Sequence, residues 1–179
     1  MGGILSYFLG SKDDPSMDIP DKATGLTPRE RQIVKDTWAL AYKNSKSVGV
    51  ELFIQLFTTY PHHQQKFPSF KNVPLSEMKL GNKKLEAHAT NVMYSLATLV
   101  DNLEDVECLI ELCSKIGENH LRRKVEQQAF LDVKTVLMKL LKEKLGSSLT
   151  PQGEEAWNKT LDLANKCIFQ AMEDKKNKA

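Results

Sequence analysis

The sequence lacks long apolar runs, a dominant charge of one sign, and the many glycines and prolines of loop-rich proteins. Nine glycines and seven prolines in 179 residues are too few for a β-protein with many turns. A net charge of +2 gives no reason to expect nucleic acid or an acidic polymer as a partner. No apolar run approaches the roughly 20 residues that span a membrane. With 41% hydrophobic residues, the chain is long enough to bury one sizeable core.

Cysteine is also scarce. Cys108, Cys113 and Cys167 form an odd set without the paired spacing of a disulfide framework. The first residues do not follow the pattern of a secretory leader, so we expect a reducing, cytoplasmic environment. The three thiols are then small side chains on helices, and a regulatory disulfide between Cys108 and Cys113 is the alternative.

The chain divides into three parts by composition. Residues 1–25 hold a short apolar stretch and then a polar segment with aspartate and proline, which is typical of a flexible extension. Residues 26–173 carry the apolar periodicity of a folded domain. Residues 174–179 are predicted to be a disordered tail.

Helical signals fill the central part. Thr27-Pro28 with Glu30 makes a capping box, and Thr150-Pro151 repeats the signal of a cap followed by proline. Between them, apolar side chains recur about every three or four residues in several windows, whereas residues 61–79 are irregular. No window alternates like a half-buried strand. The fold class is therefore predicted to be all-α.

Two of the four histidines lie on the apolar faces of predicted helices. His88 shares a face with Leu85 and Val92, and His120 lies one turn after Ile116. Each is either a core histidine bonded to a backbone carbonyl or one of two imidazoles that flank a planar metal cofactor. Two histidines are too few for a structural zinc site, which needs four ligands.

The other two histidines, His62 and His63, follow Pro61 among glutamines. They are predicted to be exposed to solvent and to have no role.

Taken together, residues 26–173 resemble the globin family. The resemblance rests on motifs that occur in the family's order: Trp38, Tyr60-Pro61, Lys66-Phe67-Pro68-Ser69-Phe70-Lys71, Leu85 to Met93 around His88, and Ile116 to Leu121 around His120. It implies a globin fold of about six to eight helices that enclose haem b.

The resemblance also assigns roles to single residues. His120 is identified as the proximal iron ligand, whose other ring nitrogen should donate to a carbonyl or hydroxyl near Ile116 or Asn119, and His88 is identified as the distal histidine. Many members carry lysine or arginine for a haem propionate where this chain has Asn91, so Lys124 is the expected substitute. The other expected pocket residues are Phe53, Phe67, Phe70, Val92, Ile116, Val125, Phe130 and Val133.

The function that this resemblance implies is reversible binding of dioxygen for storage, supply or buffering, with carbon monoxide and nitric oxide as further ligands. The alternatives use the same haem. One is a redox enzyme served by a separate reductase, acting as a nitric oxide dioxygenase, nitrite reductase or peroxidase. The other is a gas or redox sensor with both histidines on the iron. A helical bundle without haem also remains open, and the chain is expected to be a monomer or homodimer.

The first six residues, Met1-Gly2-Gly3-Ile4-Leu5-Ser6, fit the pattern for myristoylation of Gly2. One myristoyl chain gives only weak, reversible attachment. We therefore expect a cytoplasmic protein with peripheral membrane association through Gly2; a tail that starts with glycine by chance is the alternative.

Overall fold

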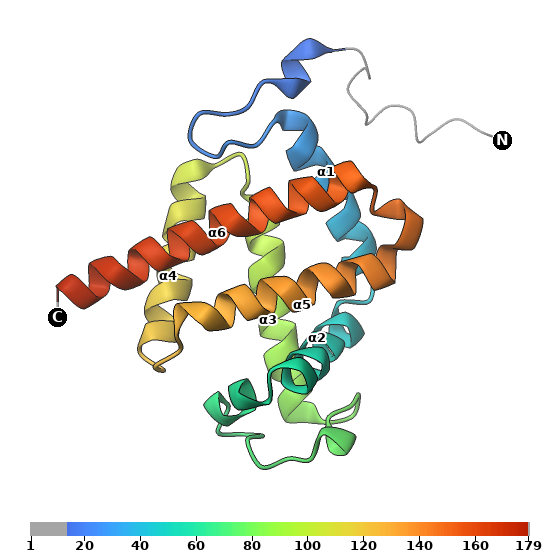
Figure 1. The fold of residues 1–179 in the computed structure, drawn as a ribbon, viewed down its shortest axis with the longest axis vertical. Helices are drawn as coiled ribbons and strands as arrows, with labels where there is room; N and C mark the ends of the chain where they lie inside the picture. Colours follow the sequence, from blue (N-terminus) through green and yellow to red (C-terminus); the bar gives the residue numbers. More distant parts are fainter. Residues whose placement is uncertain (1–13, 179) are drawn as a thin grey trace.

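The computed structural model describes residues 14–178, in which every regular element is helical (Figure 1). The α-helices are α1 (Pro28–Tyr42), α2 (Ser45–Thr59), α3 (Lys83–Asp101), α4 (Val106–Leu121), α5 (Gln127–Leu145) and α6 (Pro151–Asn177). Short 3-10 helices are η1 (Pro15–Asp18), η2 (Pro61–Lys66), η3 (Leu75–Glu77) and η4 (Gly146–Ser148). The predicted all-α class is confirmed. None of the helices within residues 14–178 is long and apolar enough to cross a membrane.

The two predicted helix starts are present. The Thr27 hydroxyl accepts a hydrogen bond from the Glu30 amide at 3.0 Å, and the Glu30 carboxylate accepts one from the Thr27 amide at 2.8 Å. Thr150 caps α6 by accepting from the amide of Gly153. These bonds satisfy amides that have no partner inside the helix, so α1 and α6 begin where the sequence predicts.

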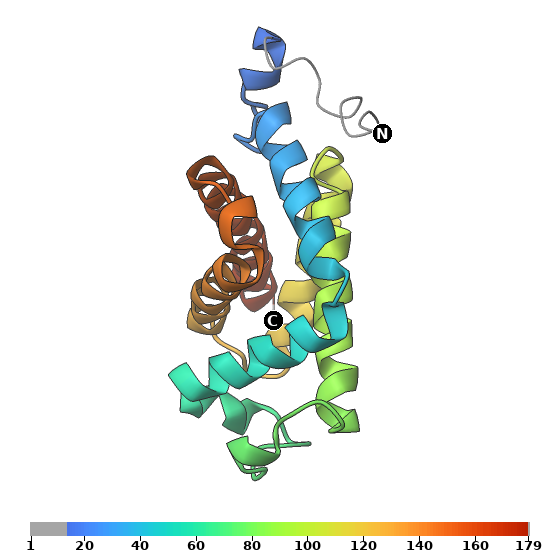
Figure 2. The same cartoon turned by 90° about the vertical axis from the view of Figure 1, so that its right-hand side faces the viewer.

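The helices form two layers. α5 and α6 lie side by side and cross α1, α3 and α4, which form the second layer, while α2 crosses one end (Figures 1 and 2). The most extensive helix contacts are between α4 and α6 and between α2 and α3. The core between the layers holds large apolar side chains, among them Trp157, Phe57, Leu52, Leu85, Leu137 and Leu140.

Glycine permits the closest helix crossings. A Cβ atom on Gly49 of α2 would lie 2.8 Å from Cγ of Met93 in α3. On Gly117 of α4 it would lie 2.8 Å from the carbonyl oxygen of Ile168 in α6. At Gly117 the backbones of α4 and α6 therefore approach more closely than any side chain allows, whereas at Gly49 the nearest backbone atom, the Ala89 carbonyl oxygen, would lie 3.1 Å away. Gly117 is one turn before His120, so this crossing sets the position of the end of α4.

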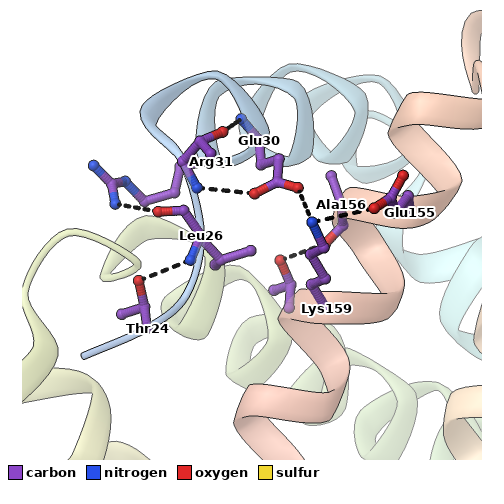
Figure 3. A network of polar contacts seen from close by, with 9 residues as sticks. Thr24, Leu26, Glu30, Arg31, Glu155, Ala156 and Lys159 are labelled. Atoms are coloured by element: carbon purple, nitrogen blue, oxygen red, sulfur yellow. Dashed lines mark hydrogen bonds and ion pairs between the residues drawn. The ribbon is translucent and has the colours of Figure 1, made fainter. Parts of the chain in front are cut away.

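Polar contacts join the first and last helices (Figure 3). Lys159 of α6 donates to the buried Glu30 carboxylate at 2.6 Å, and the buried indole of Trp157 donates to the Thr37 hydroxyl at 2.9 Å. Burial by itself would raise the pKa of Glu30, but the bonds from Lys159 and the Thr27 amide outweigh it and lower that pKa. The Glu30 carboxylate is therefore charged at neutral pH and holds α1 against α6.

Both ends of the described chain are more ordered than predicted. Residues 14–25 are not a structureless extension, because Asp14 caps η1 and Asp18 pairs with Arg29 of α1 at 2.7 Å. The tail predicted for residues 174–179 is wrong for 174–177, because α6 continues to Asn177. Lys175 reaches Glu118 of α4 at 3.4 Å, and this ion pair supports the extra turn. Gly2 and residues 1–13 lie outside the described residues.

Candidate functional site

The candidate site contains two histidines from different helices, His88 of α3 and His120 of α4. Each imidazole is half-buried, and each lies close enough to the other for a charge on His120 to lower the pKa of His88. The two helices belong to the same layer of the fold, so the turn between them brings residues far apart in sequence together. The two histidines are thus within electrostatic range of each other, and their roles at an iron stay a prediction.

Aromatic rings surround His88. Its ring centroid lies 4.9 Å from that of Phe53, 5.0 Å from that of Phe67 and 6.1 Å from that of Phe70. Phe53 comes from α2, Phe67 ends η2, and Phe70 follows in the adjoining turn. Within residues 14–178, neither ring nitrogen of His88 has a hydrogen-bond partner. Within that part of the chain, His88 therefore lacks the bond to a carbonyl that a core histidine would make.

His120 has one ring nitrogen engaged. Nδ1 lies 2.8 Å from the carbonyl oxygen of Ile116. A carbonyl only accepts, so Nδ1 carries the proton and Nε2 keeps its lone pair. The predicted bond to a group near Ile116 is confirmed. The ring centroid of His120 lies 5.0 Å from that of Phe130 in α5. Because Nδ1 is engaged, Nε2 is the basic nitrogen of this ring.

Both imidazoles favour the neutral state. Burial lowers the pKa of His88, and the nearby His120 and Arg123 lower it further. Burial also lowers the pKa of His120; the bond to Ile116 opposes this change, while Arg123 adds to it. A neutral imidazole is the form that can bind a metal.

The remaining apolar residues expected in the pocket divide into two groups. Phe53 and Phe70 are buried in the core. The others are only half-buried: Phe67, Val92, Ile116, Val125, Phe130 and Val133. Of these, Phe67 packs beside His88 and Phe130 beside His120, so both imidazoles are flanked by half-buried apolar rings that a flat apolar group would cover. The residues present therefore fit haem.

Sequence reasoning missed Arg123. It acts electrostatically on both His88 and His120, although its side chain is exposed like that of Lys124, the expected propionate partner. Lys124 has left-handed backbone with φ of 55°. The Lys124 carbonyl accepts from Lys66 at 3.0 Å, and one Arg123 nitrogen donates to the Asn119 carbonyl at 2.7 Å. The sequence shows three consecutive basic residues, Arg122 to Lys124, shortly after His120. Which of them lies near the two histidines depends on the backbone of the turn after α4, and this residue is Arg123.

The prediction that His63 is exposed is wrong. Its side chain is buried, and Nε2 lies 2.7 Å from the Asp132 carboxylate on α5. The neighbouring His62 is exposed, as expected. Pro61 starts η2, and the tight 3-10 turn brings the third residue of the segment against α5.

The model of the Globin family matches residues 50–168, from within α2 to within α6. This chain is a globin. The globin is 31% identical to cytoglobin-2 of Danio rerio over 151 residues, which cover 84% of each chain. It is 27% identical to a globin of Nerita albicilla over 146 residues, covering 81% of this chain and 92% of that one. Membership implies that the globin binds haem and a gaseous ligand.

Proposed function

We propose that this globin holds haem b between His120 and His88 and binds dioxygen reversibly, for storage, supply or buffering. One observation carries the proposal. His120 has Nδ1 bonded to Ile116 and Nε2 available, while His88 has no partner for either ring nitrogen within the described chain. The bound iron porphyrin would supply the gas-binding metal centre.

His120 is proposed as the iron ligand. Its bond to the Ile116 carbonyl fixes the tautomer and the ring orientation and raises the basicity of Nε2. Phe130 packs against the ring and restricts its rotation. Apolar contacts to the porphyrin would come from Val92, Ile116, Val125, Phe130 and Val133, and Arg123, together with Lys124 at the exposed edge, would face the propionates.

His88 is proposed as the hydrogen-bond donor to the bound gas. A neutral imidazole carries one N–H that can donate a hydrogen bond. Dioxygen held at a haem would carry more partial negative charge than carbon monoxide, so it would accept this bond more strongly. Phe53, Phe67 and Phe70 pack around this half-buried ring and form an apolar wall on their side of it. Nitric oxide is a further expected ligand of the same site.

A second function is suggested by the lack of hydrogen-bond partners for His88 within the described chain. Because no described protein group bonds to its nitrogens, His88 would also be available to hold the haem iron as a second, displaceable ligand. Iron held by two histidines favours electron transfer, so the alternative is a sensor or a redox enzyme, such as a nitric oxide dioxygenase or nitrite reductase that is served by a separate reductase.

The visible spectrum of the reduced haem-loaded protein tests these proposals. Sharp, well-split bands that become one broad band in His88→Leu would support binding of both histidines to iron. One broad band in both proteins would support a vacant gas site. In the latter case His88→Leu should release dioxygen about 10 to 100 times faster, from the loss of one hydrogen bond to a charged acceptor. The His120→Gly variant should hold haem normally only when free imidazole is added. Normal haem binding by this variant without imidazole would contradict the assignment of His120.

We also propose that Gly2 is myristoylated and that the protein is cytoplasmic and attaches weakly to membranes through this group. We further propose that it is a monomer or homodimer. Co-expression with an N-myristoyltransferase should add one acyl chain by mass, and the acylated protein should sediment with lipid vesicles. Gly2→Ala should abolish both effects. Absence of the added mass would contradict the acylation.

A further inference from the structure

We propose that His62, His63 and Asp132 form a binding site for a divalent cation of the zinc class, separate from the haem site. These are the only three His, Cys, Asp or Glu residues in the described chain whose ligand atoms gather in this way. One ligand atom from each lies within 4.8 Å of the other two. The residues come from two elements, η2 and α5, that fold against each other.

The site is built from fixed side chains. His63 and Asp132 are both more than nine-tenths buried, and His63 Nε2 lies 2.7 Å from the Asp132 carboxylate. The ring centroid of the exposed His62 lies 4.1 Å from that of His63, with the two rings tilted by 46°, so His62 is the ligand on the solvent side. Tyr60 packs against both imidazoles, at centroid distances of 6.4 Å and 6.0 Å.

Charge balance points to a cation. The Asp132 carboxylate is buried, yet within residues 14–178 no lysine or arginine pairs with it. Its two oxygens meet only the imidazole of His63 and the amide of Gln128, at 2.9 Å. A buried carboxylate is costly without a compensating positive charge. A protonated His63 supplies that charge when the site is empty, and a bound cation would supply it when His63 is neutral and acts as a ligand.

The donor set selects the type of cation. Two imidazole nitrogens and one carboxylate oxygen suit zinc, whereas calcium and magnesium prefer oxygen alone. Zinc with three protein ligands keeps a fourth position for water, which the exposed side of His62 allows. Gln128 would donate to the second carboxylate oxygen and orient the ligand. Coordination requires the His63–Asp132 pair to separate slightly, because both atoms must then face the ion.

A cation at this site would join η2 to α5. Phe67 ends η2 and lies edge-on to His88, so fixing η2 also restrains the wall of the gas site. The proposal concerns residues outside that site, and it stands or falls independently of the roles assigned to His88 and His120.

Zinc binding to the haem-loaded full chain tests the proposal by isothermal titration calorimetry. Saturation with carbon monoxide keeps His88 and His120 beside an occupied haem, so neither competes for zinc. We expect one zinc ion per chain. His62→Gln and Asp132→Asn should each weaken binding at least about tenfold, and Gln128→Ala by about 10 to 100 times as an outer partner. X-ray absorption at the zinc edge should show two imidazole ligands.

The controls change neighbouring side chains that do not face the site. Gln65→Ala alters an exposed residue of η2, and Glu143→Gln removes a carboxylate elsewhere on α5; both should bind zinc like the parent. His62→Gln alters an exposed side chain, so its fold should persist even if Asp132→Asn unfolds. The proposal is overturned by absence of zinc binding or by unchanged affinity in His62→Gln.

Discussion

At the scale of single residues, the two imidazoles of the gas site make stability depend on pH. The pKa of each histidine lies below its usual value of 6.5 in the folded chain, mainly through burial. When the pH falls below 6.5, the unfolded chain therefore binds protons before the folded chain does. Stability is full above that pH and is lost as the pH falls through the folded-state pKa.

The haem-free protein should accordingly show a lower free energy of unfolding by urea at about pH 5.5 than at about pH 7.5. Carboxylates contribute little in this window, because the usual pKa of glutamate is 4.5. His88→Leu should reduce the pH dependence, since one of the two groups is removed. Equal pH dependence in parent and variant would show that His88 is not responsible.

Arg123 has a second consequence at this scale. A positive charge near both histidines is placed to pair with a haem propionate, so Arg123→Leu should speed haem transfer to an acceptor globin. One exposed pair is worth up to about 1 kcal/mol, which is about fivefold in rate. Lys124→Leu is the matched control, and a larger effect of Lys124→Leu would return the role to that residue.

At the scale of helices, the crossing of α4 and α6 depends on Gly117. A methyl group there would meet the Ile168 carbonyl, and a backbone atom cannot rotate away. Gly117→Ala should therefore lower the free energy of unfolding by about 1–3 kcal/mol. It should also disturb the iron spectrum, because α4 carries His120.

Gly153→Ala is the matched control for this substitution. Its Cβ would meet side-chain methyl groups of Leu149 and Ile33, at 3.2 and 3.4 Å, and the Thr150 hydroxyl oxygen at an ordinary contact distance of 3.6 Å, but no backbone atom. Alanine also favours the helix over glycine by about 1 kcal/mol, so stability should change little. Chemical denaturation of both variants measures the difference, and equal losses would contradict the close crossing.

At the scale of the whole molecule, the ion pair of Glu30 and Lys159, two residues that are 129 positions apart in the chain, joins α1 to α6 (Figure 3). Lys159→Met leaves a buried carboxylate without its cation, so it should lower the melting temperature. Lys176→Met removes a surface pair with Glu173 instead and should leave the melting temperature nearly unchanged. Similar shifts in both variants would show that the α1–α6 pair is not special.

The sequence by itself determined the features that depend on local chemistry. Helix starts at Thr27 and Thr150 follow from side chains that cap nearby amides, and the all-α class follows from apolar periodicity. The same periodicity placed His88 and His120 on inward faces, and the order of motifs indicated the family. None of these inferences requires a contact between distant residues.

Only the tertiary structure decided the features that depend on such contacts. His63 looked like a surface residue until α5 brought Asp132 against it, and Arg123 differs from its basic neighbours only through the turn after α4. Residues 14–25 and 174–177 have little apolar periodicity, so their order comes from pairs with α1 and α4. Side-chain burial and partners across distant elements are set by packing of the whole chain, which local sequence does not encode.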